Sequence, residues 1–402
     1  MRSRRCLLFF LALLIVMLAV ASVIEKAVRV EKHPEAVLAV IGALILVAGM
    51  ISYHTGISTS IIELVVGGIA AATPLAVLAG DPTLETLSRL GSIVLMFIAG
   101  TEIDVYVLRR TIRKSIVIGV MSFFVPFISA SLVLRLLGYH GLRNLLTSTS
   151  VATTSVAILY MALKDLGIFN TWLGQTIFAG AMITDIISML SLSIVLGRSS
   201  IISLFYIVLI PVILVLLPRV LERIVRLESA WDLELKFILM VLLVLALISE
   251  SIGVHSAITS FMLGIAFSET VRSHEYIEKK MKGLGFGFFI PIFFFRAGLL
   301  MDYSSLAGSL LCFSVLALVA VIAKFVGAYI PLKLLLGVKE RKLANLFNAR
   351  LAIGTLAAIY GLEYGVIGTA EYSMIIGLVI LSSIPVAISI HRMPPISIEE
   401  PL

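Results

Sequence analysis

The sequence predicts an all-α polytopic membrane protein, and three observations support this prediction. The 402 residues are 60% hydrophobic and 14% charged, and their mean hydropathy is +1.12, a composition that excludes a soluble globular domain of this size. Apolar stretches of helical length follow one another along the chain. The connections between these stretches are short. The chain therefore has room for one membrane domain and none for a separate soluble domain.

Hydropathy predicts about thirteen or fourteen membrane spans, since roughly 20 apolar residues cross a bilayer core of roughly 30 Å as a helix. The candidate spans are 6–24, 36–53, 57–79, 86–107, 115–138, 145–163, 172–197, 200–225, 235–250, 255–268, 284–301, 305–332, 343–362 and 372–390. We expect an N-terminal span with its connection over 1–35, a membrane domain over 36–392 and a cytoplasmic tail over 393–402. The first span has the basic start of a cleavable signal, but its long apolar run favours an uncleaved anchor.

Lys and Arg gather in alternate connections, and this pattern predicts the orientation of the chain. The basic connections contain Arg2, Arg4 and Arg5, then Arg109, Arg110, Arg113 and Lys114, then Arg219, Arg223 and Arg226, then Arg272, Lys279, Lys280 and Lys282, then Lys333, Lys339, Arg341 and Lys342. The positive-inside rule places these connections and both termini in the cytoplasm, with the protein in the plasma membrane. The rule also accounts for the net charge of +7, so no nucleic-acid partner is implied.

Asp185 is the residue on which the prediction of function depends most. It lies near the middle of an uncharged run from Trp172 to Gly197, which is long enough to cross the bilayer as one helix. An ionised carboxylate at that depth costs at least about 2.5 kcal/mol, so an acid in a membrane span indicates a functional site. The alternative is a structural aspartate that is hydrogen-bonded to a neighbouring helix.

Two predicted spans contain polar segments that interrupt a helix. Thr147–Ser155 (TSTSVATTS) is rich in hydroxyl and β-branched side chains, which compete for backbone hydrogen bonds. The span 343–362 carries Asn345, Asn348, Arg350, Gly354, Thr355 and Gly361. For each segment alone, helix packing through small residues is the alternative. A pair of breaks, in contrast, is typical of the binding site of a transporter.

Lys324 is a second buried charge, inside the span 305–332. It lies too far from either end of the span for its ammonium to reach water by extending along the helix, so it needs a partner. One broken span precedes the span with Asp185, and the other follows the span with Lys324. This order predicts two inverted repeats whose broken helices cross at the centre of the membrane.

One continuous stretch carries a family resemblance. TSVAILYMALKDLGIFNTWLGQTIFAGAMITD, from Thr154 to Asp185, resembles the crossed helix and the ion-binding helix of the cation:proton antiporter superfamily. The similarity is to its bacterial and archaeal sodium/proton exchanger branch, of the monovalent cation:proton antiporter-2 type. The pattern of that branch ends in two adjacent carboxylates. Asp185 matches the second, essential one, whereas Thr184 stands in place of the first.

Further motifs extend the resemblance over roughly residues 36–392. Upstream, IIELVVGGI contains Glu63, and FIAGTEIDVYVLRR contains Glu102 and ends in a basic pair. Downstream, PIFFFRAGLLMD carries Arg296 where the family commonly has a small residue, and AKFVG contains the buried lysine of the family, Lys324. The second broken helix has Arg350 in the family position but lacks the glutamate that follows it in the family.

Arg296 is left unexplained by the family pattern. Because charges buried in membranes usually pair, we expect it to form an ion pair with Glu102, Asp104 or Glu63. The alternative is a direct role in transport. Arg296, Arg350, Glu102 and Glu63 are thus candidates for structural or tuning charges.

The predicted site combines a carboxylate with hydroxyl and free carbonyl oxygens. Hard oxygen ligands suit a hard cation, Na⁺ first, with Li⁺ and K⁺ as further candidates. The same carboxylate can bind a proton in place of the cation, and competition for one site gives exchange. The expected ion-binding and proton-binding residues are Asp185, Thr153, Thr154, Ser155 and Thr184, with Lys324 as the compensating charge.

The resemblance implies a monovalent cation/proton antiporter that serves pH homeostasis and forms a homodimer. A core domain with Asp185 and Lys324 is expected to move as a rigid body against a dimerisation domain built from the early helices and the span 200–225. No cofactor is expected besides the transported ions. No enzyme activity is expected either, because no catalytic motif appears and the six His lie at loops or span ends.

Other functions stay open from the sequence. A channel-like potassium efflux protein of the same superfamily would share these helices, although such proteins normally add a soluble regulatory domain. An intramembrane enzyme would need a catalytic set. A sensor that kept the fold without transport is a third class, because fold does not fix function.

The stoichiometry of exchange depends on Lys324 and on the missing first carboxylate. If Lys324 is a tether of constant charge, Asp185 alone exchanges one proton for one cation, and transport is electroneutral. If Lys324 takes up a proton whenever the cation leaves, transport is electrogenic. We expect the electroneutral case, because Thr184 cannot take the role of the acid that would exchange pairing with the lysine.

Overall fold

The structure is a computed structural model that describes residues 34–197, 216–227, 231–338 and 341–391. Over these residues the regular elements are all helices, as the sequence predicts. The expected span 6–24, most of the expected span 200–225 and the expected tail 393–402 lie outside the described residues.

Every predicted span within the described residues coincides with one or more helices. The elements are α2 (Pro34–Thr55), α3 (Thr59–Ala71), η1 (Pro74–Gly80), α4 (Pro82–Thr101), α5 (Val105–Leu136), α6 (Gly141–Ala152), α7 (Val156–Asp165), α8 (Trp172–Leu196), α10 (Leu233–Ser251), α11 (Ser256–Ser273), α12 (Glu275–Leu284), the π-helical turn η2 (Gly285–Phe289), α13 (Ile290–Leu299), α14 (Tyr303–Gly308), α15 (Leu310–Leu336), α16 (Arg341–Asn345), η3 (Leu346–Asn348), α17 (Ala352–Glu363) and α18 (Thr369–His391). Among the described residues, eight helical segments are long and apolar enough to cross a membrane, or up to nine if a bent pair counts as one span.

The bent pair is α3 with η1, and it corrects the prediction of one straight span over 57–79. The chain turns by 110° between the two helices. Pro74 begins η1, and it has no N–H with which to continue the hydrogen bonds of α3. The Thr73 side chain instead accepts a hydrogen bond from the backbone N–H of Leu75, which caps the new helix.

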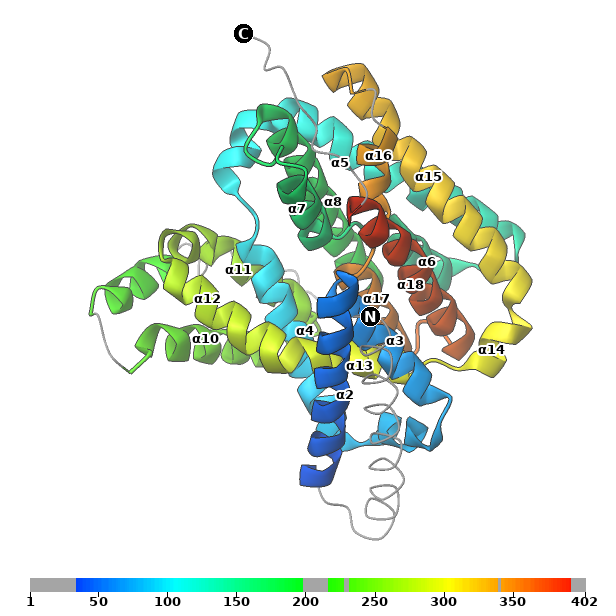
Figure 1. Ribbon diagram of the computed structural model, residues 1–402, viewed down its shortest axis with the longest axis horizontal. Coiled ribbons are helices and arrows are strands. Elements are labelled where there is room, and N and C mark those ends of the chain that lie inside the picture. Colours follow the sequence, from blue (N-terminus) through cyan, green and yellow to red (C-terminus); the bar gives the residue numbers. More distant parts are fainter. Residues whose placement is uncertain (1–33, 198–215, 228–230, 339–340, 392–402) are drawn as a thin grey trace, which may run out of the picture.

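The helices form two bundles (Figure 1). We call α2, α3, α4 and α10 to α13 the panel bundle, in which α4 packs along α11 and α3 along α13. We call α5 to α8 and α15 to α18 the core bundle, in which α5 packs along both α8 and α15. Contacts between the bundles are sparse and include those of α13 with α17 and of α3 with α18. Asp185 in α8 and Lys324 in α15 both lie in the core bundle, as the predicted core domain requires. The predicted dimerisation domain stays a prediction, because most of the span 200–225 lies outside the described residues.

Glycines allow the panel helices to approach each other closely. A Cβ atom on Gly100 of α4 would lie 2.2 Å from the carbonyl oxygen of Phe261 in α11, and a Cβ on Gly264 would lie 2.1 Å from that of Phe97. A Cβ on Gly67 of α3 would likewise lie 2.0 Å from the carbonyl oxygen of Phe295. Such small-residue contacts pack membrane helices tightly. The helices of the panel bundle are therefore packed closely against each other.

The core bundle contains the same order of elements twice. Helix α5, the interrupted pair α6 and α7, and helix α8 form the first unit. Helix α15, the interrupted set α16, η3 and α17, and helix α18 form the second. This order confirms the predicted pair of repeats, each with one broken helix.

Candidate functional site: the crossing of two broken helices

The first break covers Thr153–Ser155 only, between α6 and α7. The preceding hydroxyl-rich residues are helical, and their side chains bond carbonyls of the preceding turn: Thr147 donates to Arg143 and Thr149 to Leu145, at 2.9 and 2.8 Å. Hydroxyl groups used in this way are compatible with a helix. The predicted break thus occurs at the end of the predicted segment.

The second break covers residues 349–351, between η3 and α17. It touches the first break directly, because the backbone N–H of Ser155 donates to the carbonyl oxygen of Ala349 at 2.7 Å. The two interrupted helices therefore cross with their extended segments in contact. This crossing, rather than either helix alone, forms the candidate site.

Two buried cations bind the last carbonyls of α6. Lys324 Nζ donates to the carbonyl oxygens of Ala152 at 2.5 Å and of Ser122 at 2.9 Å. Arg350 Nε donates to the carbonyl oxygen of Val151 at 2.6 Å. Both side chains are fully buried. Since the C-terminal end of a helix carries partial negative charge and unpaired carbonyls, the two cations neutralise and satisfy the end of α6.

Arg350 also links the two repeats. Its Nη2 donates to the carbonyl oxygen of Ala320 in α15 at 2.8 Å, and its Nη1 donates to that of Asn348 at 3.0 Å. Together with the bond to Val151, these contacts join α6, α15 and the second break. Arg350 therefore holds the crossing together, which supports a structural reason for its burial.

Asp185 lies in α8, which packs against α6, α7 and α17 at the crossing. Its side chain is 6% exposed, and among the described residues nothing forms a hydrogen bond with its Oδ1 atom. Lys324 forms its hydrogen bonds with carbonyls instead. An aspartate held for structural reasons would bond a neighbouring helix, so the free oxygen favours a binding role.

Three hydroxyl groups near the crossing share this property. The hydroxyl oxygens of Thr154, Ser122 and Thr355 are buried and have no hydrogen-bond partner within the described part of the chain. An unpartnered buried polar group costs about 1–3 kcal/mol. These oxygens are therefore available to a bound cation or water. The predicted ion-binding set includes Thr154 but neither Ser122 nor Thr355. Thr355 was predicted only as part of the polar segment in 343–362, and Ser122, a single hydroxyl in an apolar helix, gives no signal.

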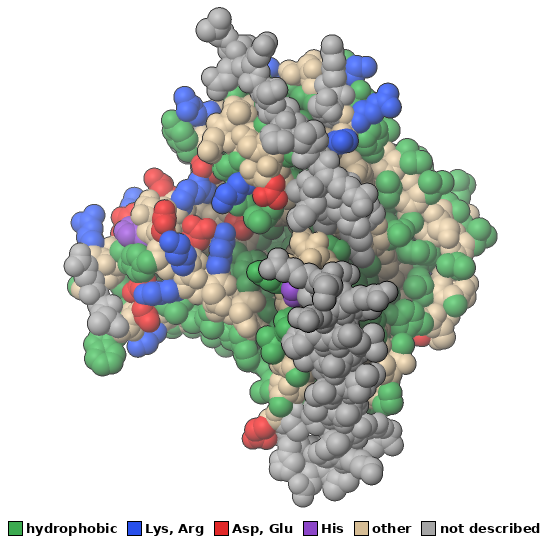
Figure 2. Space-filling model, in the orientation of Figure 1, with side chains coloured by type: hydrophobic (Ala, Val, Ile, Leu, Met, Phe, Trp, Pro, Cys, Tyr) green, Lys and Arg blue, Asp and Glu red, His purple; other side chains and the backbone are tan. Residues whose placement is uncertain are grey.

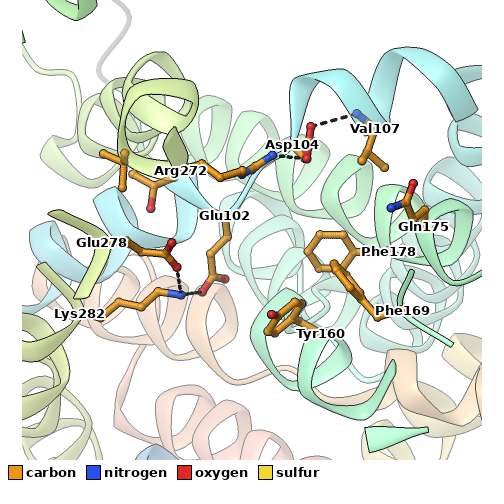
Figure 3. Close-up of a pocket in the computed structure, with 12 residues that line it drawn as sticks. Glu102, Asp104, Val107, Tyr160, Phe169, Gln175, Phe178, Arg272, Glu278 and Lys282 are labelled. Atoms are coloured by element: carbon orange, nitrogen blue, oxygen red, sulfur yellow. Dashed lines mark hydrogen bonds and ion pairs between the residues drawn. The ribbon is translucent and has the colours of Figure 1, made fainter. Parts of the chain in front are cut away.

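A cavity of about 370 Å³ leads to the crossing. It is lined at the crossing by Ser155, Leu351 and Ala352, and at its other end by Glu102 and Lys282. A second cavity, of about 260 Å³, shares Glu102, Tyr160 and Lys282 with the first (Figure 3). The two cavities together give water and small ions a way in toward the crossing.

The mouth of these cavities carries paired charges. Lys282 lies between two carboxylates, 2.8 Å from Glu278 and 3.5 Å from Glu102, and Arg272 pairs with Asp104 (Figure 3). Blue and red side chains gather over this part of the surface, near α11 and α12, while much of the remaining visible face is green or tan (Figure 2). The mouth is therefore polar, whereas the cavity behind it is lined mainly by apolar side chains.

Comparison with known proteins places this arrangement in a family. The family described as "Sodium/hydrogen exchanger, transmembrane" matches residues 36–393. The chain belongs to this family. A relative named probable Na⁺/H⁺ antiporter 3, from Methanocaldococcus jannaschii, is 29% identical over 339 residues, which are 80% of this chain and 86% of the relative. The Na⁺/H⁺ antiporter of Enterococcus hirae is 29% identical over 307 residues, 72% of this chain and 80% of its own length.

The fold of this sodium/hydrogen exchanger also matches a solved structure. The sodium proton antiporter MjNhaP1 from Methanocaldococcus jannaschii aligns with a TM-score of 0.69 at 17% identity, over 87% of this chain and 96% of that one. The resemblance predicted from Thr154–Asp185 and the accompanying motifs is thus confirmed.

Other predicted ligands of this exchanger already have partners. The Thr153 hydroxyl donates to the Ser150 carbonyl at 2.9 Å. The Thr184 hydroxyl lies 3.1 Å from the Gly180 carbonyl oxygen and 3.3 Å from that of Gly119, so it faces α5 and packs α8 against it. For these two residues, binding a cation through the hydroxyl would require these contacts to change.

The ion pair predicted for Arg296 exists, but its predicted partners were wrong. Arg296 Nη1 lies 2.8 Å from Glu363 Oε1, and Nη2 lies 3.9 Å from Glu85 Oε2. Glu85 lies in the first turn of α4, whereas Glu102 follows the last turn of the same helix. Arg296 is therefore at the opposite end of α4 from Glu102 and the cavity mouth.

Glu63 lies in α3 of the panel bundle and is 2% exposed. Among the described residues its Oε2 atom has no hydrogen-bond partner. Arg296 does not supply one, since it pairs with Glu363. The role of Glu63 as a tuning charge thus stays a prediction.

Proposed function

We propose that this chain exchanges a monovalent cation, Na⁺ in the first place, for protons. Asp185 would bind either the cation or a proton, and the hydroxyl and carbonyl oxygens of the crossing, with Thr154 foremost, would complete the shell around the cation. The observation that carries this proposal is the buried, unpartnered Oδ1 of Asp185 beside the crossing. Buried oxygens without partners are what a hard cation needs from its site.

The cavity mouth would face the cytoplasm. The basic connection that contains Arg272 and Lys282 borders this mouth, and the positive-inside rule assigns such connections to the cytoplasmic side of the plasma membrane. Under this assignment both termini are cytoplasmic. Alternating access would follow from rigid-body movement of the core bundle against the panel bundle, which would also provide the contact of a homodimer.

Lys324 would act as a tether of constant charge. Its ammonium bonds two carbonyls, those of Ser122 and Ala152. It has no hydrogen bond to Asp185 that would be exchanged when a cation binds. Transport would then move one proton for each cation and be electroneutral. The absence of the first carboxylate, whose place Thr184 takes, also favours electroneutral transport.

The test is proton flux in reconstituted vesicles loaded with a pH-sensitive dye. Addition of Na⁺, Li⁺ or K⁺ to wild-type vesicles is expected to release protons, with Na⁺ the most effective. Asp185→Asn preserves size and removes the ionisable group, so its flux should fall to the level of empty vesicles. Absence of cation-driven proton flux in the wild type would instead favour the non-transporting sensor. K⁺ flux without proton coupling would favour the channel-like function.

A further inference from the structure

A cluster of four charges joins the two bundles at the end of α4 that is opposite the cavity mouth. Arg296 Nη1 lies 2.8 Å from Glu363 Oε1, and Arg89 Nη2 lies 3.7 Å from Glu363 Oε2. Arg89 also pairs with Glu85 at 2.9 Å. We call Glu85, Arg89, Arg296 and Glu363 the Glu363 network. Glu363 belongs to the core bundle, and the other three belong to the panel bundle.

The pair at the centre of the network is shielded from water. The Arg296 side chain is 6% exposed and the Glu363 side chain is 15% exposed, compared with 49% for Arg89. Removing one partner of a buried ion pair leaves the other charge buried without compensation, which is strongly destabilising. The arrangement of the bundles that buries Arg296 therefore depends on Glu363.

Tyr360 strengthens the same junction one turn earlier in α17. Its hydroxyl forms a short hydrogen bond with the Ser92 hydroxyl of α4. The ring of His255, the N-cap residue of α11, lies 3.5 Å from the Tyr360 ring, centre to centre. Both contacts join the panel bundle to α17. Tyr360 and Glu363 thus fix one face of α17 to the panel.

The network holds the half-helix that leads away from the ion site. Helix α17 begins at Ala352, directly after the second break, and ends at Glu363. At the beginning of α17, the cavity reaches Leu351 and Ala352. At its end, the panel contacts Glu363. The cavity thus lies at the beginning of α17, and the contacts with the panel bundle lie at its end.

We propose that the Glu363 network is the closure of the ion site on the face opposite the cavity, and that it breaks each time the site opens to that face. The proposal rests on the exchange function proposed above. When the bundles separate at this junction, Arg296 and Glu363 become hydrated. A variant that removes one of them raises the free energy of the closed state more than that of the open state. The state with the network closed is also the state with the cavity open, so molecules of such a variant should populate this state less than the wild type does.

The test measures how accessible the cavity is. Ala157 lines the cavity and is exposed, so Ala157→Cys, in a protein with Cys6 and Cys312 replaced by Ser, reports its opening through the rate of maleimide labelling in detergent. Glu363→Gln and Arg296→Gln are each expected to lower this rate at least threefold. The double variant Arg296→Glu with Glu363→Arg restores the central ion pair but sets a carboxylate beside Glu85 and a guanidinium beside Arg89, so it should recover part of the rate.

A pair within the core bundle supplies the control. Arg143 of α6 pairs with Glu371 of α18, and the Glu371 side chain is 3% exposed whereas that of Arg143 is 54% exposed. Glu371→Gln therefore breaks an ion pair with a buried carboxylate inside the core bundle. It should leave the labelling rate unchanged. Unchanged labelling in both Glu363→Gln and Arg296→Gln, or an equal fall in Glu371→Gln, would overturn the proposal.

A milder variant allows the test to be made even if the charge variants do not fold. Tyr360→Phe removes the bond to Ser92 and leaves all charges in place, and it should lower labelling in the same direction by a smaller factor. An unchanged rate in Tyr360→Phe, if the charge variants do not fold, would count against the closure. Labelling needs no transported ion, so a shift in labelling without cation-driven proton flux would reject the exchange function and keep the closure.

Discussion

At the scale of single residues, the site depends on oxygen atoms that the fold buries without giving them a partner. Asp185 is the one carboxylate among the four such oxygens near the crossing, and Thr154 provides a hydroxyl from the first break. Each unpartnered oxygen costs about 1–3 kcal/mol in the absence of a ligand. A bound cation removes that cost, which is a direct source of binding free energy.

Thr154→Val tests whether this hydroxyl binds the cation. Valine has nearly the same shape but lacks the oxygen, so the half-saturating Na⁺ concentration should rise about 5–20-fold, the equivalent of about 1–2 kcal/mol. The maximal rate should change little. The measurement is proton flux in vesicles over a range of Na⁺ concentrations.

Thr147→Val is the matched control for this prediction. Thr147 is equally buried in α6, but its hydroxyl is bonded to the Arg143 carbonyl of its own helix. Its replacement should leave the half-saturating concentration unchanged. If Thr154→Val behaves in the same way, the hydroxyls of this segment serve helix packing alone.

At the scale of elements, the end of helix α6 depends on cations from the other repeat. Val151 and Ala152 expose carbonyls at the break, and Arg350 and Lys324 bond them. Free carbonyls inside a membrane protein are tolerated where another group satisfies them. The broken helix is therefore stable only as part of the pair of repeats.

Arg350→Met should destabilise the protein strongly. Methionine fills part of the volume but donates no hydrogen bond, so the carbonyls of Val151 and Ala320 lose the donor that Arg350 gives them, at about 1–3 kcal/mol each. The apparent Tm in detergent, followed by intrinsic fluorescence, should fall by several degrees. Arg341→Met is the control, because Arg341 is exposed in α16. Equal Tm values for the two variants would contradict this account of Arg350.

At the scale of the whole molecule, exchange requires two bundles that move as units. Close glycine contacts hold the panel bundle together, and the crossing holds the core bundle together. Between them lie sparse contacts and the Glu363 network. Few contacts must therefore break when one bundle moves relative to the other.

The net charge moved in one transport cycle is a property of the whole molecule. Because Lys324 is bonded to carbonyls in the state described here, we expect the rate of Na⁺/H⁺ exchange to be independent of membrane potential. The measurement is exchange in vesicles whose potential is clamped with K⁺ and valinomycin. A rate that follows the imposed potential, with reversal at twice the proton gradient, would show electrogenic transport.

Thr184→Asp tests whether the missing carboxylate is the reason for electroneutral transport. It restores the adjacent carboxylate that the family pattern has before Asp185, and it places an acid on the face of α8 that packs against α5. A new partner for Lys324 would allow its charge to change during the cycle. This variant is expected to become dependent on membrane potential, whereas Thr184→Ser should behave as the wild type does.

The sequence by itself determined the helical fold, the two spans that are broken, the position of Asp185 within an uncharged helix and the family. These features are local: hydropathy over about 20 residues defines a span, and the hydroxyl, glycine and asparagine content of a segment indicates that a break lies in or next to it. The motif from Thr154 to Asp185 is continuous, so it too could be recognised without any knowledge of packing.

Only the tertiary structure decided how the buried charges pair and which hydroxyls stay free. Lys324 and its acceptor Ser122 are 202 residues apart, and Arg296 and Glu363 are 67 residues apart. The sequence placed Arg296 with the wrong carboxylates because hydropathy does not tell at which end of the bundle a charge meets another helix. For the same reason Ser122 and Thr355 were not predicted as ligands: whether a hydroxyl finds an acceptor depends on the helices packed against it.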